Sequence, residues 1–372
     1  MPSINDIAMI AEALEQSPVA VVADRCIAVR NRNATCRKCV NACSAGAIDV
    51  SGNEIRLNSS LCTACGICTV VCPVECLVPL KPDDASLAKS AVSSVSSNSG
   101  TCVFACARIA SKRLADPASY AEVPCLSRLD ESIIVSAVSF GAESIVFVDG
   151  DCSTCKYRDN SECFNTTVSL TERLFEAFNI QLPMKRETGF PADLLVEGAH
   201  ELHGTSRRGF FSEAIGVARD TAMTAAKTSI DHEFGINQEI APIGNRLRVT
   251  EEGTLPLITA RRHEAVLNEL YDHGVPRGGS LESRLFGAVT VDTRKCNSCG
   301  MCIMFCPTAA LRRDSATSPR DPLECIEFFA SSCIQCSLCV DVCWKHALEM
   351  GGEVSIDQLF DFEPVVFNLK SR

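Results

Sequence analysis

The sequence has few histidines, few aromatic residues and no excess of positive charge. Its 372 residues include six histidines, one tryptophan and three tyrosines, and 35 Lys and Arg against 46 Asp and Glu give a formal net charge of −11. This charge excludes the basic surface that is typical of a nucleic-acid-binding protein. Glycine loops of the GxGxxG and Walker types and the HExxH zinc motif are also missing, so no catalytic motif of these classes is predicted.

A membrane span and a secretion signal are not predicted either. Residues 61–80 form an apolar run that is long enough to cross a bilayer, but five of its residues are cysteine and two are proline. The first 18 residues place acidic side chains where a secretion signal carries basic ones, and they predict a short amphipathic helix. We therefore expect a cytoplasmic protein, and a peripheral position at a membrane complex is compatible with this expectation.

Cysteine is the residue that is present in excess. The chain has 24 cysteines, and in a reducing compartment such residues are metal ligands or redox centres more often than disulfides. Nine lie in 26–76, six in 102–163 and nine in 296–343. This distribution and the chain length both suit three cysteine-containing domains. Their predicted bounds are 1–80, 101–195 and 287–351.

Three segments are predicted to connect or follow these domains. Residues 81–100 are rich in serine and predict a linker. Residues 196–286 predict a mainly helical connector, with helices over 208–230 and 257–273. Residues 352–372 are expected to form a tail.

The first and last cysteine-rich segments contain one motif, C-x2-C-x2-C-x3-C, in four copies that form two tandem pairs. The complete copies are Cys62, Cys65, Cys68 and Cys72; Cys296, Cys299, Cys302 and Cys306; and Cys333, Cys336, Cys339 and Cys343. The incomplete copy consists of Asn33, Cys36, Cys39 and Cys43. Proline follows the fourth cysteine as Pro73 and Pro307, but Trp344 follows Cys343. This repeated spacing indicates iron–sulfur ligands, because a cubane cluster needs four converging soft thiolates.

These motifs resemble the bacterial-type two-cluster ferredoxins over residues 25–80 and 287–351. The resemblance implies an α+β ferredoxin-like module at each end of the chain and four 4Fe-4S clusters in total. In that family, three cysteines of one motif and the fourth cysteine of its partner motif bind the same cluster. The implied ligand sets are group I (Cys26, Cys36, Cys39, Cys72), group II (Cys62, Cys65, Cys68, Cys43), group III (Cys296, Cys299, Cys302, Cys343) and group IV (Cys333, Cys336, Cys339, Cys306).

The fourth ligand of group I has two interpretations. Asn33 is a poor ligand for a soft metal, so Cys26, seven residues upstream, is favoured, and the alternative is a three-iron cluster on the other three cysteines. Basic residues, Lys38 among them, crowd this loop and are expected to raise the cluster potential. Cys76 aligns with alanine in the other copies, which predicts a packing role. Zinc knuckles are the alternative at both ends, although zinc sites typically combine CxxC pairs or histidines.

The cysteines in the middle of the chain follow a different pattern. Apolar strands predicted over 101–105, 120–124 and 144–150 alternate with helices, which predicts a parallel α/β sheet of flavodoxin-like type with helices after it. Ligands of such sheets bind beyond the carboxyl ends of the strands, where this order places cysteines. The predicted central site contains Cys106, Cys125, Cys152 and Cys155, with Cys163 and Cys102 as alternates.

Two stretches of this domain resemble the delta subunit of methyl-viologen-reducing hydrogenase, an iron–sulfur protein that passes electrons to heterodisulfide reductase. They are VPCLSRLD at 123–130 and GAESIVFVDGDCSTCKY at 141–157. The resemblance implies a 2Fe-2S or related cluster at the central site. A zinc site and a redox-active dithiol of Cys152 and Cys155 are the alternatives, because a CxxC unit is compatible with both.

These patterns predict an iron–sulfur electron-transfer subunit of a multi-subunit oxidoreductase complex of anaerobic metabolism. The expected partners are redox protein subunits of flavoprotein, hydrogenase or molybdenum type, with a hydrogenase or heterodisulfide-reductase-like partner favoured. Two other classes remain as alternatives. One is an enzyme with an open iron edge at group I, and the other is a scaffold or redox sensor that uses the central thiols.

Overall fold

The computed structural model describes residues 18–196, 247, 249–250, 253–314 and 323–369. The helices predicted at the start of the chain and over 208–230 lie outside these ranges. Within them, no helix has both the length and the apolar character that a membrane span requires.

The N-terminal module, residues 18–80, consists of two antiparallel strand pairs and three short helices. Its elements are β1 (Val19–Val21), α2 (Ile27–Arg30), α3 (Lys38–Ala42), β2 (Ile48–Ser51), β3 (Glu54–Leu57), α4 (Ile67–Val71) and β4 (Leu77–Pro79). β1 pairs with β4, and β2 pairs with β3. Gly52 and Asn53 turn the β2–β3 hairpin with φ angles of 58° and 61°, as a two-residue hairpin loop requires.

The C-terminal module, residues 280–369, repeats this arrangement with additional strands. Its elements are β9 (Ser280–Glu282), β10 (Ala288–Val291), α12 (Met301–Phe305), β11 (Leu311–Arg312), β12 (Cys325–Phe328), α13 (Leu338–Asp341), β13 (Leu348–Gly351), β14 (Glu353–Ser355), α14 (Ile356–Phe360) and β15 (Val365–Asn368). The prediction of a tail over 352–372 is wrong for its described part. β14 pairs with β9, and β15 pairs with β12. Val354 of β14 and Ile356 and Leu359 of α14 are buried, so this segment adds apolar side chains to the core.

The central domain contains the predicted parallel sheet. Its strands are β5 (Thr101–Cys106), β6 (Ala121–Val123), β7 (Ser144–Val148) and β8 (Met184–Glu187), in the order β6-β5-β7-β8 with every pair parallel. This order corresponds to the first four strands of the flavodoxin-type order. The helices between them include α6 (Ala107–Ala110), α7 (Glu131–Ser139) and α8 (Ser161–Ala177). Phe164 of α8 packs edge-on against Phe147 of β7.

The prediction of a serine-rich linker is wrong, because residues 84–97 form helix α5 (Asp84–Ser97). Asp83 caps this helix by accepting a hydrogen bond from the main-chain N–H of Ser86 at 2.6 Å. Leu87, Ala91 and Val95 recur every four residues and are buried against the sheet. The serines occupy other positions, and two of them, Ser90 and Ser96, donate their hydroxyl groups to carbonyls within the helix.

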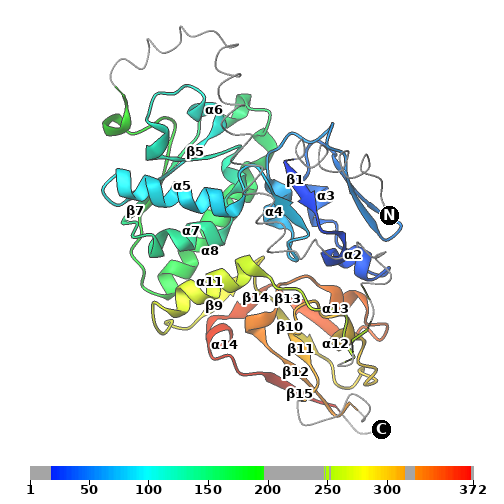
Figure 1. Cartoon of the computed structure of the whole chain (residues 1–372). Helices are drawn as coiled ribbons and strands as arrows, with labels where there is room; N and C mark the ends of the chain where they lie inside the picture. The colour runs from blue at the N-terminus through cyan, green and yellow to red at the C-terminus, as the bar shows by residue number, and fades with distance from the viewer. Residues whose placement is uncertain (1–17, 197–246, 248, 251–252, 315–322, 370–372) are drawn as a thin grey trace.

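Helix α11 (Arg261–Tyr271) lies where the three parts of the chain meet (Figure 1). It packs against α7 of the central domain, and its first residues contact the N-terminal module. Thr35 donates hydrogen bonds to Asp341, and Lys38 donates to the main chain of Gln335, so the two terminal modules also touch directly. The loop that carries Cys36 and Cys39 therefore lies beside the loop that carries Cys333 and Cys336.

Candidate metal centres

Short loops and one-turn helices position the thiols of both terminal modules. In each complete motif, a residue in the left-handed region separates the second cysteine from the helix that carries the third. These residues are Gly66 (φ 81°), Gly300 (φ 71°) and Ser337 (φ 62°). The sharp turn allows three cysteines of one motif to surround one position.

The thiols of group I lie close enough to repel one another when charged. Burial raises the pKa of Cys39 to about 12, and three neighbouring thiols contribute to the rise. These thiols belong to Cys72, Cys26 and Cys36. The structure thus brings Cys26 together with the three motif cysteines of group I, as predicted for the favoured interpretation, although its role as a ligand stays a prediction.

The other three groups show the same mutual effect. Burial raises the pKa of one cysteine in each group, and the remaining members of that group raise it further by charge repulsion. The affected cysteine and its neighbours are Cys68 with Cys65, Cys62 and Cys43; Cys302 with Cys296, Cys299 and Cys343; and Cys339 with Cys336, Cys333 and Cys306. The members of each implied set therefore lie within electrostatic reach of one another, and their sharing of one cluster stays a prediction.

A main-chain hydrogen bond to sulfur recurs at the fourth cysteine of all four copies. The N–H group four residues later donates to this sulfur at 3.2–3.3 Å. The pairs are Ala47 to Cys43, Cys76 to Cys72, Ala310 to Cys306, and Ala347 to Cys343. Such N–H groups stabilise negative charge on sulfur, which suits a thiolate ligand of a cluster.

Cys76 has a contact that the alignment of the motifs did not predict. Its side chain is 1% exposed, as the predicted packing role requires, and it also makes a hydrogen bond with the sulfur of Cys26. This bond lowers the pKa of Cys26 below its ordinary value, and burial opposes the change. Cys76 is therefore positioned to support the Cys26 thiolate.

Basic side chains from distant parts of the sequence approach groups I and IV. The charge of Lys38 opposes the burial that raises the pKa of Cys36, Cys333 and Cys336. Arg262 is buried and donates to the carbonyl of Cys72 at 2.6 Å, and its charge favours the Cys72 thiolate. The sequence placed Lys38 in a basic loop, but no local signal identified Arg262, which lies 190 residues from Cys72.

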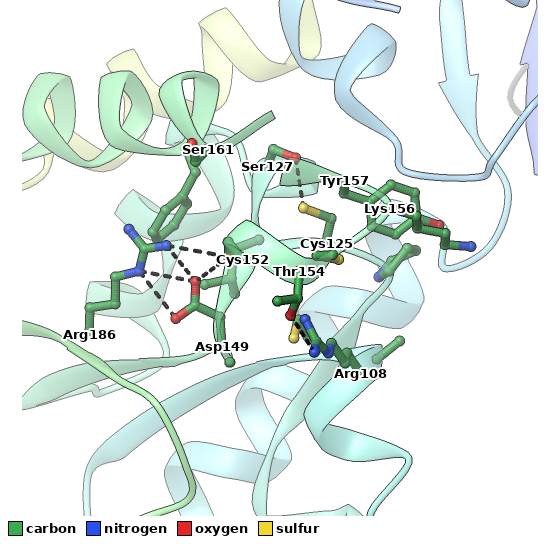
Figure 2. Close-up of a pocket in the computed structure, with 17 residues that line it drawn as sticks. Arg108, Cys125, Ser127, Asp149, Cys152, Thr154, Lys156, Tyr157, Ser161 and Arg186 are labelled. Atoms are coloured by element: carbon green, nitrogen blue, oxygen red, sulfur yellow. Dashed lines mark hydrogen bonds and ion pairs between the residues drawn. The ribbon is translucent and has the colours of Figure 1, made fainter. Parts of the chain in front are cut away.

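The four predicted cysteines of the central site line one pocket of about 440 Å³ at the carboxyl ends of the strands. Cys106 ends β5, Cys125 follows β6, and Cys152 and Cys155 lie in the loop after β7. Arg108 holds this loop by donating to the carbonyl of Asp151 at 2.7 Å and to the hydroxyl of Thr154 at 2.8 Å. Figure 2 shows Cys125 beside Ser127, whose hydroxyl donates to its sulfur at 3.0 Å.

One side of the pocket contains a polar cluster that the sequence did not reveal. The carboxylate of Asp149 accepts a hydrogen bond from the Cys152 thiol at 3.1 Å and forms an ion pair with Arg186 (Figure 2). Burial and then Asp149 raise the pKa of Cys152 to about 11, while Arg186 opposes the rise. Asp149 lies in the sequence stretch VFVDGD at 146–151. Arg186 comes from β8, and only the fold shows that β8 pairs with β7.

The two alternate cysteines lie elsewhere. Cys163 of α8 accepts a hydrogen bond from Arg284 at 3.3 Å, and the same arginine pairs with buried Glu131 at 2.8 Å. Cys102 is fully buried within β5 and faces the carbonyl of Ala91 in α5. Neither of them lines the central pocket.

The donors in the four terminal groups fit iron–sulfur clusters. Each terminal group offers four thiols and at least one N–H group directed at a ligand sulfur. Within the part of the chain that the structure describes, no three His, Cys, Asp or Glu side chains are arranged to hold a single metal ion.

Comparisons with protein families identify the three cysteine-containing regions. Residues 55–78 match the family model of a 4Fe-4S binding domain, and residues 288–344 match that of a 4Fe-4S dicluster domain. Residues 97–185 match the delta subunit of methyl-viologen-reducing hydrogenase. Both predicted resemblances are confirmed, and the incomplete motif copy lies outside the matched ranges. No curated protein and no solved structure matches the chain.

Proposed function

We propose that this chain, in which a hydrogenase delta-subunit-like domain lies between two 4Fe-4S regions, relays electrons between redox protein subunits of an oxidoreductase complex. The family matches support iron–sulfur clusters and an electron-transfer role. In the proposal, groups I to IV each hold a 4Fe-4S cluster within α+β ferredoxin-like modules. Cys106, Cys125, Cys152 and Cys155 hold a further cluster, of 2Fe-2S or related type, in the flavodoxin-like domain.

Each bound cluster would supply one-electron redox chemistry. The protein side chains supply the thiolates, the N–H groups that stabilise them and the apolar surroundings that exclude water. Burial raises the pKa of most of these thiols, so a bare site would retain protons, and assembly would release them. The hydrogen bonds from Cys76, Ala310 and their equivalents offset this cost at the fourth cysteine.

The observation that carries the proposal is the serial order of the five groups. Cys65 of group II is within electrostatic reach of Cys125 at the central site, and Tyr157 of the pocket donates its hydroxyl to the carbonyl of Thr63. Cys39 of group I likewise affects the pKa of Cys68 in group II. The central site is therefore followed by group II and then by group I.

The series continues into the C-terminal module. Lys38 lies between the two modules and affects the pKa of Cys36 in group I and of Cys333 in group IV. Cys302 of group III affects the pKa of Cys339 in group IV. The order that we propose is central site, II, I, IV, III. A catalyst with one working centre has no need of such a series, whereas a relay depends on it.

The two ends of the series are the places where partners are expected. One end is the open pocket of the central domain, and the other is group III, whose Cys299 is exposed. We favour a hydrogenase or heterodisulfide-reductase-like partner because of the delta-subunit match, with flavoprotein and molybdenum-type subunits as the other candidates. The proposed setting is the cytoplasm of an anaerobic cell.

Iron and acid-labile sulfide, counted per chain after anaerobic isolation, test the cluster content. About sixteen irons support the four terminal clusters alone, and about eighteen to twenty support the central cluster as well. The C125S/C155S double variant is expected to lose only the central irons, whereas C163S and C102S keep them. Zinc without sulfide, or a Cys152–Cys155 couple without iron, would contradict the central assignment. A chain without any iron would contradict the relay.

A further inference from the structure

Group III is the most exposed of the cysteine groups. Of the 24 cysteines in the chain, Cys299 alone is classed as exposed, and the others are buried or half-buried. Group III also ends the series of groups, next to group IV and remote from the central pocket. In Figure 1, α12 and α13 lie on the opposite side of the molecule from the central sheet.

The residues that flank group III are basic or aromatic, and they point into solvent. Arg294 and Lys295 directly precede Cys296, and their side chains are 83% and 58% exposed. Trp344 directly follows Cys343 and is 60% exposed. The ammonium group of Lys345 lies 4.0 Å from the centre of the Trp344 ring. An exposed tryptophan beside a cation is typical of an interaction surface.

These flanking residues depart from the other complete copies of the motif. Leu61 and Ser332 precede the first cysteine in two of the complete copies, and Pro73 and Pro307 follow the fourth cysteine in two of them; in the incomplete copy Arg32 and Ser44 occupy these positions. The basic pair belongs to one copy and Trp344 to another. The N–H of Asp292 donates to the carbonyl of Ala347 at 2.8 Å, and this contact brings the segment of the basic pair beside the segment of Trp344. Two independent departures that meet at one site indicate a role specific to group III.

The charge of this surface is opposite in sign to that of the whole chain. The chain carries a formal net charge of −11, which would repel another acidic protein over most of its surface. The cations that flank group III are Arg294, Lys295 and Lys345. Asp292 forms loose ion pairs of 3.7 and 3.6 Å with Arg294 and Lys295. Exposed pairs of this kind are weak, so both cations remain available to a partner.

We infer that Trp344, Arg294, Lys295 and Lys345 form a docking surface for an acidic single-electron carrier protein. The inference rests on the proposed relay and names the partner class at its outer end. During exchange, one electron leaves the donor and one is gained by the acceptor, with no bond made and no proton moved. Electrostatic attraction brings the carrier to this face, and Trp344 supplies an apolar contact beside the exposed Cys299.

Binding can be followed without any turnover, because Trp344 is the single tryptophan of the chain. The probe is a purified acidic 4Fe-4S ferredoxin without tryptophan, added to the holoprotein at low salt. We expect protection of Trp344 fluorescence from acrylamide quenching, and carbodiimide cross-links from Lys295 and Lys345 to carboxylates of the probe. Affinity is expected to fall as the salt concentration rises.

Three variants separate docking from cluster assembly. R294E/K295E is expected to weaken probe binding at least about tenfold at low salt and to reduce its salt dependence. The matched control R173E/K185E reverses two exposed charges on the central domain and is expected to bind like the wild type. W344P restores the residue that follows the fourth cysteine in two other copies. W344P is expected to keep its iron content and to lose affinity for the probe. Because this variant has no tryptophan, its affinity is measured by calorimetry.

The possible failures are distinguishable. If R294E/K295E and R173E/K185E weaken binding equally, the docking surface is refuted while the iron content still supports the relay. Protection of Trp344 by self-association, seen as a dimer in the absence of the probe, would also refute it by assigning this face to a second copy of the chain. Absence of iron would refute the relay itself.

Discussion

The ammonium group of Lys38 lies 3.2 Å from the main-chain carbonyl oxygen of Gln335. This hydrogen bond joins the loop of group I in one module to the loop of group IV in the other. The same cation is within electrostatic reach of Cys36, Cys333 and Cys336. One side chain therefore influences two thiol groups through a contact between residues that are 297 positions apart in the sequence.

Replacing Lys38 by methionine is expected to lower the reduction potentials of the clusters at groups I and IV. A nearby cation favours the more negative reduced state, and its loss in a partly solvated interior corresponds to roughly 20–60 mV. A redox titration monitored by paramagnetic resonance measures the shift. K38R keeps the charge and should restore the potentials, and K112M, on an exposed lysine of the central domain, should leave them unchanged. Equal shifts in K38M and K112M would contradict the assignment.

Changing Cys26 to serine is expected to remove the fourth thiolate of group I. The cluster there should then be lost or reduced to three irons, so the iron content falls by about one to four per chain. C76A leaves the four thiols of group I in place and removes only the hydrogen bond to Cys26. We expect it to keep its iron content. A C26S protein with full iron content and an unchanged resonance spectrum would show that Cys26 is not a ligand.

The sequence predicted the features that depend on short-range spacing. Cysteine spacing identified the motif copies that contain Cys39, Cys68, Cys302 and Cys339, because a thiol loop is a local structure, whereas the crossed sets came from the ferredoxin resemblance. The order of strands and helices likewise placed Cys106 and its partners in one pocket, since parallel strands present their carboxyl ends at one edge of a sheet.

Features that depend on tertiary packing were missed. The composition of α5 suggested a linker, because serine is common in linkers. The four-residue spacing of Leu87, Ala91 and Val95 is instead typical of a helix with one buried face, as the structure shows. Arg262 and Arg186 reach their sites from distant elements, and no local pattern reports such a contact.

Replacing Gly66 by alanine is expected to destabilise the contact between the N-terminal module and the central domain. Gly66 has a φ of 81°, and an added Cβ atom would lie 2.5 Å from Cδ of Arg128, a buried residue that pairs with Asp84. Left-handed backbone strain and overpacking together predict a loss of about 2–4 kcal/mol in the free energy of unfolding. Denaturant titration of the holoprotein measures this loss.

Gly46 provides the control for this substitution. Its φ is 60°, but nothing lies within 4 Å of an added Cβ atom, so G46A is expected to cost only about 1 kcal/mol from backbone strain. The difference between G66A and G46A isolates the contact with Arg128. Equal losses in the two variants would mean that Arg128 adjusts freely.

His263 is buried between the modules and uncharged. Its ring packs against Phe286 at 4.7 Å between ring centres and makes a hydrogen bond to the main chain of Cys333, while its Nε2 atom has no hydrogen-bond partner. Burial lowers the pKa of His263 to about 4. As the pH falls, the imidazole of His263 therefore gains a proton near pH 6.5 in the unfolded chain, but only near pH 4 in the folded chain.

The contribution of His263 to stability is accordingly complete above about pH 6.5 and is lost as the pH falls toward 4. Between pH 7 and pH 5 the expected loss in the free energy of unfolding is about 2 kcal/mol. H263Q keeps a donor for the Cys333 carbonyl but cannot titrate. The loss in its free energy of unfolding between pH 7 and pH 5 should therefore be smaller than that of the wild type by this amount. H346Q removes an exposed histidine and should retain the wild-type slope. Parallel slopes for H263Q and the wild type would show that His263 titrates alike in both states.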